Sequence, residues 1–483
     1  METNTVLSGR SLKFSIIFCL VFVAYGTTEI LQSSLFQSDG YICLLLVYVG
    51  FLVSSLTAPL LVQKIGPVAT LWRCAIFYAL IVLVGSFGEM VPGWLRLLTC
   101  LTVGFAGGGF WSAQALYLSL LTQSKLLKTE ESVSEALSRS TSIFFAVFSS
   151  AQLLSQLLAS AILSGLQNSG RNTAISALFG TLTIVASLGT FGLALLKDPR
   201  APGSEALRGL PCSSKQGNGV PGISPPEASV RRATEEEKEP PLIRVGEEGS
   251  LVEECVSASS TPRPPPNPLQ VFFFFIREPS LVASAPFLFY GGGSLGFVLG
   301  PFLGSFSSQR IGVSMVGFVS AAYNATNILA ALPIHALVRK QWFGRRWIFF
   351  SGTLLHLAWL TCASVLLSGA EGSGAPREAA PSDYALVFGV IVIFGCAAPV
   401  YQSQLPALLQ TWYLSPWEST SAIAVYRVFF SLGFMAAQGL SIAFLHSTGK
   451  ACLSQQCAIW AGVLFFSGMA LLWLHVTGRR RVE

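Results

Sequence analysis

Apolar runs of membrane-spanning length follow one another along almost the whole chain, separated by short polar turns. A helix that crosses a bilayer needs ~20 mainly apolar residues, and twelve windows satisfy this. Six precede residue 200 and six follow residue 278: 14–36, 41–63, 69–89, 94–120, 138–166, 172–196, 279–305, 311–338, 345–369, 383–410, 418–446 and 455–477. The pattern predicts an all-α polytopic membrane protein with twelve transmembrane helices in two six-helix halves.

The segment between the halves has a different composition. Residues 197–278 are rich in proline, glycine, serine and charge, so they cannot bury enough apolar surface to fold alone. We therefore predict an N-terminal bundle at 1–196, a disordered linker at 197–278 and a C-terminal bundle with a short basic tail at 279–483. Thr234, behind Arg231 and Arg232, is a candidate phosphosite, and "PRPPPNP" is a candidate ligand for a proline-binding module.

Composition agrees with the membrane assignment. Only 11% of residues are charged and 52% are hydrophobic, with a mean hydropathy of +0.60, whereas a soluble domain is about a quarter charged. A net charge of +6 is too modest to indicate nucleic-acid binding. The lipid bilayer is the expected partner. No phosphate-binding loop, nucleophile elbow or metal-ligand cluster is recognisable, so we predict neither a cofactor, nor a metal, nor an enzyme.

Basic residues predict the orientation. With the N-terminus in the cytosol, most lysines and arginines fall on the cytosolic side, and the opposite loops hold only Arg96, Arg171, Arg310, Arg377 and Lys450. Such a bias sets membrane topology. Both termini and the linker are therefore expected in the cytosol. Cys452 and Cys457, in the last short loop, are close enough in sequence to form a disulfide if that loop faces an oxidising compartment.

The two halves repeat several features. A Tyr-Gly pair occurs in the first window (25–26) and in the seventh (290–291). A glutamine follows an aromatic residue by three positions in the fourth and tenth windows: Trp111 with Gln114, and Tyr401 with Gln404. Many transporters build a midplane cavity between halves related in this way.

The fourth window contains the stretch "GFAGGGFWSAQALYL". Its three glycines, 107 to 109, predict the close approach of a neighbouring helix backbone. Trp111, Gln114 and Tyr117 then lie on one helical face. A glutamine facing lipid would leave its amide unsatisfied, so two interpretations of Gln114 stand: an interhelical hydrogen bond, or a residue that lines a wet cavity.

Two charges lie inside predicted spans, where an ionised group costs at least ~2.5 kcal/mol on insertion scales. Glu29 and Arg427 would lie roughly 24 Å and 15 Å from the cytosolic side at ~1.5 Å per residue, which argues against a direct ion pair. Glu29 is either a proton-coupling carboxylate or a side chain that reaches the outer interface. Arg427 needs a partner or water. His335 and His356 have no partner at metal-ligand spacing.

With these residues in view, the chain resembles the major facilitator superfamily. The turns after the second and eighth windows resemble its cytoplasmic signature loops; the first copy lacks the acidic residue and the arginine cluster. The resembling positions are Lys64 and Gly66 in the first turn, and Arg339, Lys340, Gly344, Arg345 and Arg346 in the second.

Within the superfamily the chain resembles the Unc-93-like family, through "AYGTTEILQSSLF" with its Gln32-Ser33-Ser34 run, "PLLVQKIGP" and "GFAGGGFWSAQALYL", with a looser match at "SAIAVYRVFFSLGF". The resemblance implies a facilitator-fold protein that regulates a potassium channel or escorts a receptor, hence a membrane-protein partner. The alternative is a secondary transporter of a small polar solute. The residues predicted to line its cavity or solute path are Glu29, Gln32, Trp111, Gln114, Tyr401 and Gln404.

Overall fold

The computed structural model describes residues 2–126, 133–166, 168, 170–197, 268–339, 345–370, 379–413, 416–450 and 452–476. Internal contacts divide the chain into two units, Met1–Ala201 with Pro265–Glu483, and Pro202–Pro264. The second unit, including the predicted phosphosite Thr234, lies outside the described residues. The first unit contains all of the described helices.

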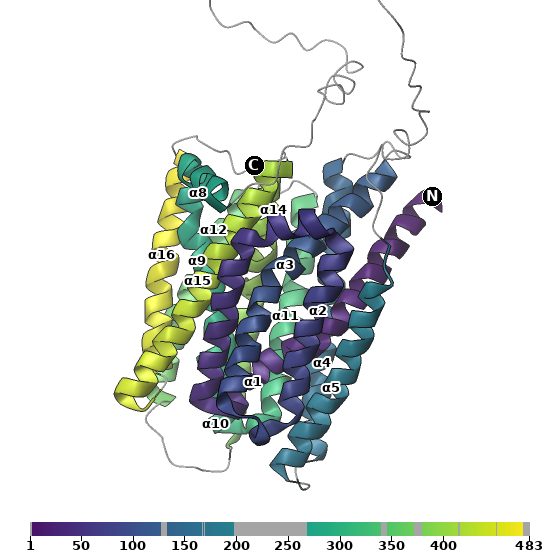
Figure 1. The fold of residues 1–483 in the computed structure, drawn as a ribbon. Helices are drawn as coiled ribbons and strands as arrows, with labels where there is room; N and C mark the ends of the chain where they lie inside the picture. Colours follow the sequence, from purple (N-terminus) through teal and green to yellow (C-terminus); the bar gives the residue numbers. More distant parts are fainter. Residues whose placement is uncertain are drawn as a thin grey trace, which may run out of the picture. The chain divides into compact units, whose positions relative to one another are not determined.

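Helices make up nearly all of the described chain and run side by side (Figure 1). The first half, residues 2–197, contains α1 (Glu2–Ile65), α2 (Pro67–Ser86), the 3-10 turn η1 (Gly88–Met90), α3 (Gly93–Leu126), α4 (Val133–Gly165) and α5 (Arg171–Ala194). The second half, residues 268–476, contains α8 (Pro268–Arg277), α9 (Pro279–Phe297), the π-helical η3 (Val298–Ser307), α10 (Ser308–Ile311), α11 (Val313–Arg339), α12 (Arg345–Ala370), α13 (Pro381–Pro399), the π-helical η4 (Val400–Gln404), α14 (Leu405–Trp412), α15 (Pro416–Thr448) and α16 (Leu453–Val476).

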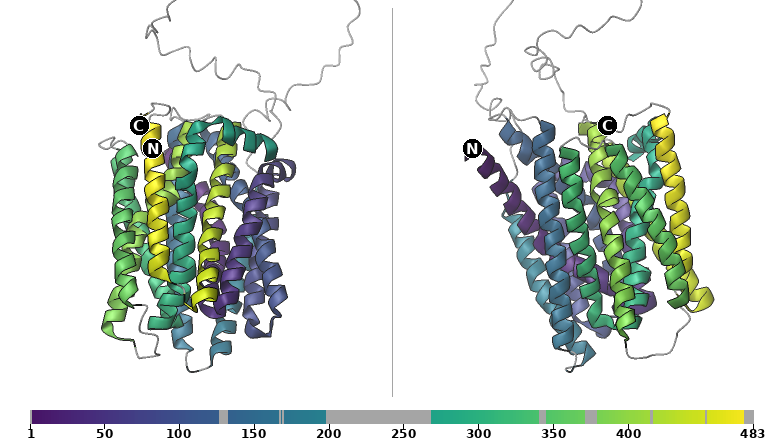
Figure 2. Two further views of the ribbon diagram at one scale, coloured as in Figure 1. Left: turned by 90° about the vertical axis from the view of Figure 1, so that its left-hand side faces the viewer. Right: turned by 180° about the vertical axis from the view of Figure 1, so that it is seen from behind.

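Every predicted window coincides with helix, so the all-α polytopic prediction is confirmed. In the described part of the chain, ten helical stretches are long and apolar enough to cross a membrane. The other two windows, 94–120 and 455–477, coincide with α3 and α16. The start of α1 and the end of α16 lie at one end of the bundle, which we call the terminal end; the opposite end is the far end (Figures 1 and 2).

The helix α1 is a hairpin of two spans, Gly9–Phe36 and Asp39–Ile65. A straight helix would separate Glu29 from Tyr48, 19 residues on, by about 28 Å. Instead the Tyr48 hydroxyl donates a hydrogen bond of 3.1 Å to the Glu29 carboxylate. The chain therefore reverses direction near Asp39, as the first two apolar windows predict.

Glycines bring the second span of α1 against α3. A Cβ on Gly50 would lie 2.6 Å from the carbonyl oxygen of Leu101, and one on Gly108 would lie 2.6 Å from the backbone nitrogen of Ser55. The Ser54 hydroxyl accepts a hydrogen bond from the Gly108 N–H at 3.1 Å. Backbone-to-backbone packing of this kind needs residues without a side chain, so the close approach predicted from "GGG" is confirmed.

The halves share a packing scheme. In the first half α2 packs on α5 and α1 on α3; in the second, α12 packs on α16 and α11 on α13. The repeated tyrosines make corresponding contacts. Tyr25 stacks edge-on against Tyr78 of α2, with ring centroids 4.7 Å apart. Tyr290 contacts His356 of α12, with its hydroxyl 3.0 Å from the histidine Nδ1. The division into two six-helix bundles around a linker stays a prediction.

The helix α8 lies within the predicted linker 197–278. Its sequence, "PLQVFFFFIR", is too short to span a bilayer and follows a proline-rich stretch, so the apolar windows did not include it. Its buried side chains, Val271 and Phe274, anchor it to the second half, and the Phe274 ring lies 5.4 Å from that of Tyr413. The structure thus continues the helical bundle upstream of the predicted boundary at 279.

The glycine contact gives a first prediction. Gly108→Ala should lower the free energy of unfolding by ~1–3 kcal/mol, because its methyl group would overlap Ser54 and Ser55 and overpack the interface. Gly180→Ala is the matched control: nothing lies within 4 Å of a Cβ there, so a gain of ~0.5–1 kcal/mol is expected. Unfolding of the two variants in detergent compares them directly. Equal stability would contradict the close approach.

Candidate functional site at the seam between the halves

The seam is the surface along which the first half meets the second. There α1 packs against α15 and η3, and α4 packs against α11. The helix α1 therefore lies beside η3 and α15, and α4 beside α11, although these elements are far apart in sequence (Figure 2).

Hydrogen bonds close the seam at its far end. Ser33 donates to the carbonyl oxygen of Leu299 at 2.8 Å, and Ser34 donates to that of Leu303 at 3.4 Å. The hydroxyls of Tyr41 and Ser305 share a further bond. Each of these bonds joins the first half to the second. The Gln-Ser-Ser run that carries the family resemblance therefore has a structural role here, which spacing alone did not reveal.

The acceptors belong to the π-helical segment η3, which contains Pro301. In a π-helix, residue 301 would donate to the carbonyl of Gly296, five residues earlier, but proline has no N–H. Gln438 of α15 donates to this carbonyl, with its Nε2 2.8 Å from the Gly296 oxygen. The Gly296 carbonyl thus has a side-chain donor next to the proline-containing turn, which suits a hydrocarbon environment.

Arg427 of α15 enters the middle of the seam. Its guanidinium carbon lies 4.8 Å from the ring centroid of Trp111, 5.3 Å from that of Tyr426 and 5.8 Å from that of Phe51. Phe51 and Trp111 belong to the first half. The Nε atom is buried and has no hydrogen-bond partner among the described residues. Cation–π contacts hold this charge, and each is worth ~0.5–2 kcal/mol.

Glu29 does not pair with Arg427. Its carboxylate accepts a bond from Tyr48, whose ring stacks on Phe434 of the second half with centroids 3.5 Å apart. An ion pair does form at the far end, where Arg310 lies 2.6 Å from Asp383. Among the described residues no ion pair joins Glu29 to Arg427; the expected difference in their depths stays a prediction. The bond to Tyr48 keeps the carboxylate inside the bundle, which argues against the interpretation that the Glu29 side chain reaches the outer interface.

Gln114 follows Trp111 by one helical turn on α3, so the two residues share a helical face. It is 6% exposed, and its amide makes no hydrogen bond within the described part of the chain. Tyr117, a further turn along, packs on Phe14, with ring centroids 4.5 Å apart. The interhelical hydrogen bond that was one interpretation of Gln114 is therefore absent from the described residues. The wet-cavity interpretation remains a prediction.

Gln32 and Tyr401 bond within their own halves. Gln32 is buried and its Nε2 lies 3.5 Å from the Cys100 sulfur of α3. Tyr401 is 1% exposed and donates to the Gly352 carbonyl at 3.4 Å. Both side chains pack as internal parts of a half.

Gln402, rather than Gln404, carries the polar network of the tenth span. Gln402 donates to the Tyr323 hydroxyl at 2.9 Å and accepts from Asn327 at 3.3 Å. The repeat analysis chose Gln404 by counting three residues from Tyr401. These positions fall in the π-helical η4, whose wider turn breaks the three-residue step of an α-helix.

The signature loops lie at the terminal end. Gly66 has φ of 91° at the turn between α1 and α2, a conformation that favours glycine, and Lys64 beside it is exposed. Of the second loop, Lys340 and Gly344 lie outside the described residues. Arg339 ends α11 and Arg345 and Arg346 begin α12. Cys452 and Cys457 are both buried, and they are not joined by a disulfide in the described part of the chain.

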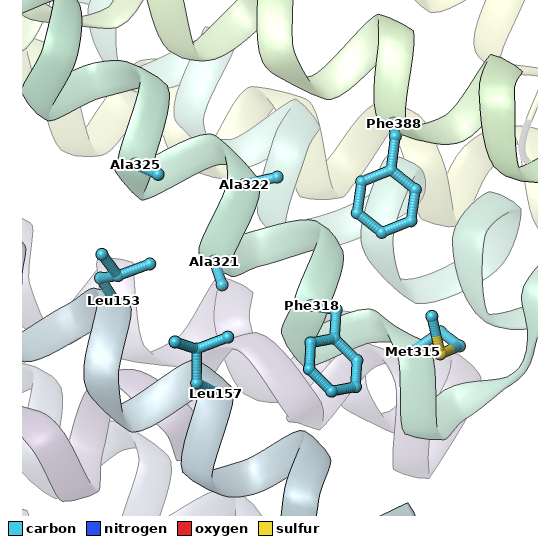
Figure 3. A pocket seen from close by; sticks show the side chains of 8 residues that line it. All are labelled: Leu153, Leu157, Met315, Phe318, Ala321, Ala322, Ala325 and Phe388. Atoms are coloured by element: carbon cyan, nitrogen blue, oxygen red, sulfur yellow. The ribbon is translucent and has the colours of Figure 1, made fainter.

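A groove of about 470 Å³ opens beside the seam (Figure 3). Its lining is wholly apolar and comes from both halves: Leu153 and Leu157 of α4, Met315, Phe318, Ala321, Ala322 and Ala325 of α11, and Phe388 of α13. The predicted path residues do not line it. This groove is distinct from the Arg427 region.

Comparison with solved structures defines the class. The chain superposes on a D-xylose-proton symporter with a TM-score of 0.60 at 13% identity, covering 98% of this chain and 96% of the other. It also superposes on FucP, a major facilitator superfamily transporter in the outward conformation, with a TM-score of 0.53 at 11% identity, covering 95% and 97%. This protein is therefore a multi-pass membrane protein with the major facilitator fold, as predicted.

Sequence comparison narrows the class. The family model described as "Ion channel regulatory protein UNC-93" matches residues 32–216. Protein unc-93 homolog A is 25% identical in Danio rerio, covering 95% of this chain and 89% of the relative, and 25% identical in Homo sapiens, covering 94% and 90%. UNC93-like protein 3 of Arabidopsis thaliana is 24% identical, covering 89% and 82%. The resemblance to the Unc-93-like family, predicted from motifs, is thus confirmed along almost the whole chain.

The pairing of Gln438 with Pro301 gives a second prediction. Gln438→Leu should lower the free energy of unfolding by ~1–3 kcal/mol, because it leaves the buried Gly296 carbonyl unsatisfied. Adding Pro301→Ala should restore part of that loss, since residue 301 then has its own N–H. A double-mutant cycle in detergent measures the coupling. Strictly additive effects would show that the Gln438 hydrogen bond does not compensate for the N–H that Pro301 lacks.

Proposed function

We propose that this chain regulates or escorts a partner membrane protein, an ion channel or a receptor, in the manner its family resemblance implies. The observation that carries the proposal is the match of residues 32–216 to a family described as ion channel regulatory. That region holds the second span of α1 and all of α2 to α5. It also contains Phe51 and Trp111, the first-half residues that hold Arg427.

The seam supports this proposal. Rings from both halves, such as Tyr48 on Phe434, occupy it, and hydrogen bonds close its far end. Gln32 and Tyr401, predicted to line a solute path, are instead buried and bonded within their own halves. The first signature loop also lacks the arginine cluster of a typical transporter. A regulator needs a stable helical surface in the membrane, whereas a transporter needs a polar path.

The second candidate is a secondary transporter of a small polar solute. The solved structures on which the chain superposes include a D-xylose-proton symporter. Glu29 and Gln114 favour it, since Glu29 is a carboxylate inside the bundle and the buried Gln114 amide makes no hydrogen bond among the described residues. Glu29 would then be the proton-coupling group.

We also propose that both termini and the signature loops face the cytosol. The support is the concentration of basic residues at the terminal end, with few in the opposite loops. The far end, closed by Ser33 and Tyr41, would then face outward or into a lumen.

Two measurements separate the candidates. The purified full-length protein, reconstituted alone with a pH gradient, is expected to give no saturable uptake across a panel of small polar metabolites. In cells that lack the gene, whole-cell ion currents or surface abundance of a receptor should change, and the wild-type gene should restore them.

Glu29→Gln provides the discriminating variant, with Glu418→Gln in the first turn of α15 as its control. Saturable uptake by wild type that is weakened by Glu29→Gln alone would overturn the regulatory proposal and support the transporter. Unchanged currents and receptor abundance in the deleted cells would also count against regulation.

A further inference from the structure

Arg427 is a charged group whose hydrogen-bonding capacity is unused among the residues that the structure describes. A guanidinium carries five N–H donors in a planar fork that matches a carboxylate. Within the described chain Arg427 forms neither a hydrogen bond nor an ion pair, and its Nε is buried. Native proteins rarely leave a buried charge without an acceptor, because desolvation costs several kcal/mol. The fork is therefore suited to an acceptor that the described residues do not supply.

The surroundings limit what the acceptor can be. Trp111 and Phe51 contribute flat apolar faces from the first half, at 4.8 and 5.8 Å from the guanidinium carbon. Tyr426 contributes a third ring from α15 itself. Tyr48 also lies near enough to interact with the charge, but its hydroxyl already donates to Glu29. The rings therefore form an apolar enclosure around one cationic group.

Gln114 is the second unused donor. It follows Trp111 by three residues on α3 and so shares its face, and its amide makes no hydrogen bond among the described residues. One guanidinium and one neutral amide match a group with a single negative charge.

We propose that Arg427 and Gln114 bind the carboxylate of a small organic anion in the seam, with Trp111 and Phe51 packing on its flat apolar body. The ligand spans the two halves, so its binding favours the arrangement in which α15 contacts α1 and α3. This site goes beyond the proposed regulatory function and does not depend on it, because binding is read on the isolated protein.

Equilibrium dialysis of labelled benzoate with the purified full-length protein in detergent tests the proposal. Benzamide, the neutral isostere, serves as the ligand control. Benzoate should bind saturably and at least about tenfold more tightly than benzamide. Arg427→Gln should lower the affinity at least about tenfold. Arg427→Lys, which keeps the charge and loses the fork, should lower it by a smaller factor.

Arg96 supplies the protein control. Its guanidinium also lies over a ring, 3.9 Å from the centroid of Phe36, but it donates to the Gly88 carbonyl at 3.2 Å. Arg96→Gln should therefore bind benzoate as wild type does. If Arg427→Gln does not fold, Gln114→Leu carries the test, with a several-fold weaker affinity expected.

Two results would overturn the site. The first is that the wild-type protein binds none of acetate, benzoate and phenylacetate more tightly than the corresponding amide. This measurement needs no variant. The second is unchanged benzoate affinity in folded Arg427→Gln or Gln114→Leu.

Discussion

Arg427 is the group on which the arrangement of the two halves depends. Carrying a guanidinium into a membrane-spanning helix costs at least ~2.5 kcal/mol on insertion scales, and the chain offsets that cost with rings from both halves. Phe51 and Trp111 lie on helices that glycine contacts hold backbone to backbone, through Gly50 and Gly108. Close packing inside the first half thus places the aromatic surface that the second half's charge requires.

The absence of water inside a membrane also explains the hydrogen bonds at the far end of the seam. Hydrocarbon offers no hydrogen-bond partners, so each backbone carbonyl released by an irregular helix must find a side chain. Ser33 and Ser34 donate to carbonyls of the π-helical η3, which contains Pro301, and Gln438 donates to the Gly296 carbonyl at the end of α9 just before it. An irregularity in one half is therefore satisfied partly by the other, which joins the halves through side chain-to-backbone hydrogen bonds.

The sequence predicts what depends on local pattern. Apolar windows identify every span, and the three glycines identify a close backbone contact. Both features depend on the residues of the segment itself, so the local sequence is enough to predict them. Bonds between distant segments are not encoded locally, so the pairing of Ser33 with Leu299 was not predicted. The choice of Gln404 over Gln402 followed from assuming α-helical spacing where the chain is π-helical. The helix α8 fell within the predicted linker because its ten residues are too few to span a membrane.

The seam is closed at its far end and holds unbonded polar groups at its middle. This arrangement is tested most directly by Gln114→Cys in a background with the linker cysteines Cys212 and Cys255 and the exposed Cys362 and Cys396 replaced by serine. A membrane-impermeant thiol reagent is applied to oriented vesicles from either side, with Ala113→Cys, a fully buried neighbour, as control. Labelling of residue 114 is expected from the terminal side only. Labelling from the far side, or inertness from both sides, would contradict this arrangement.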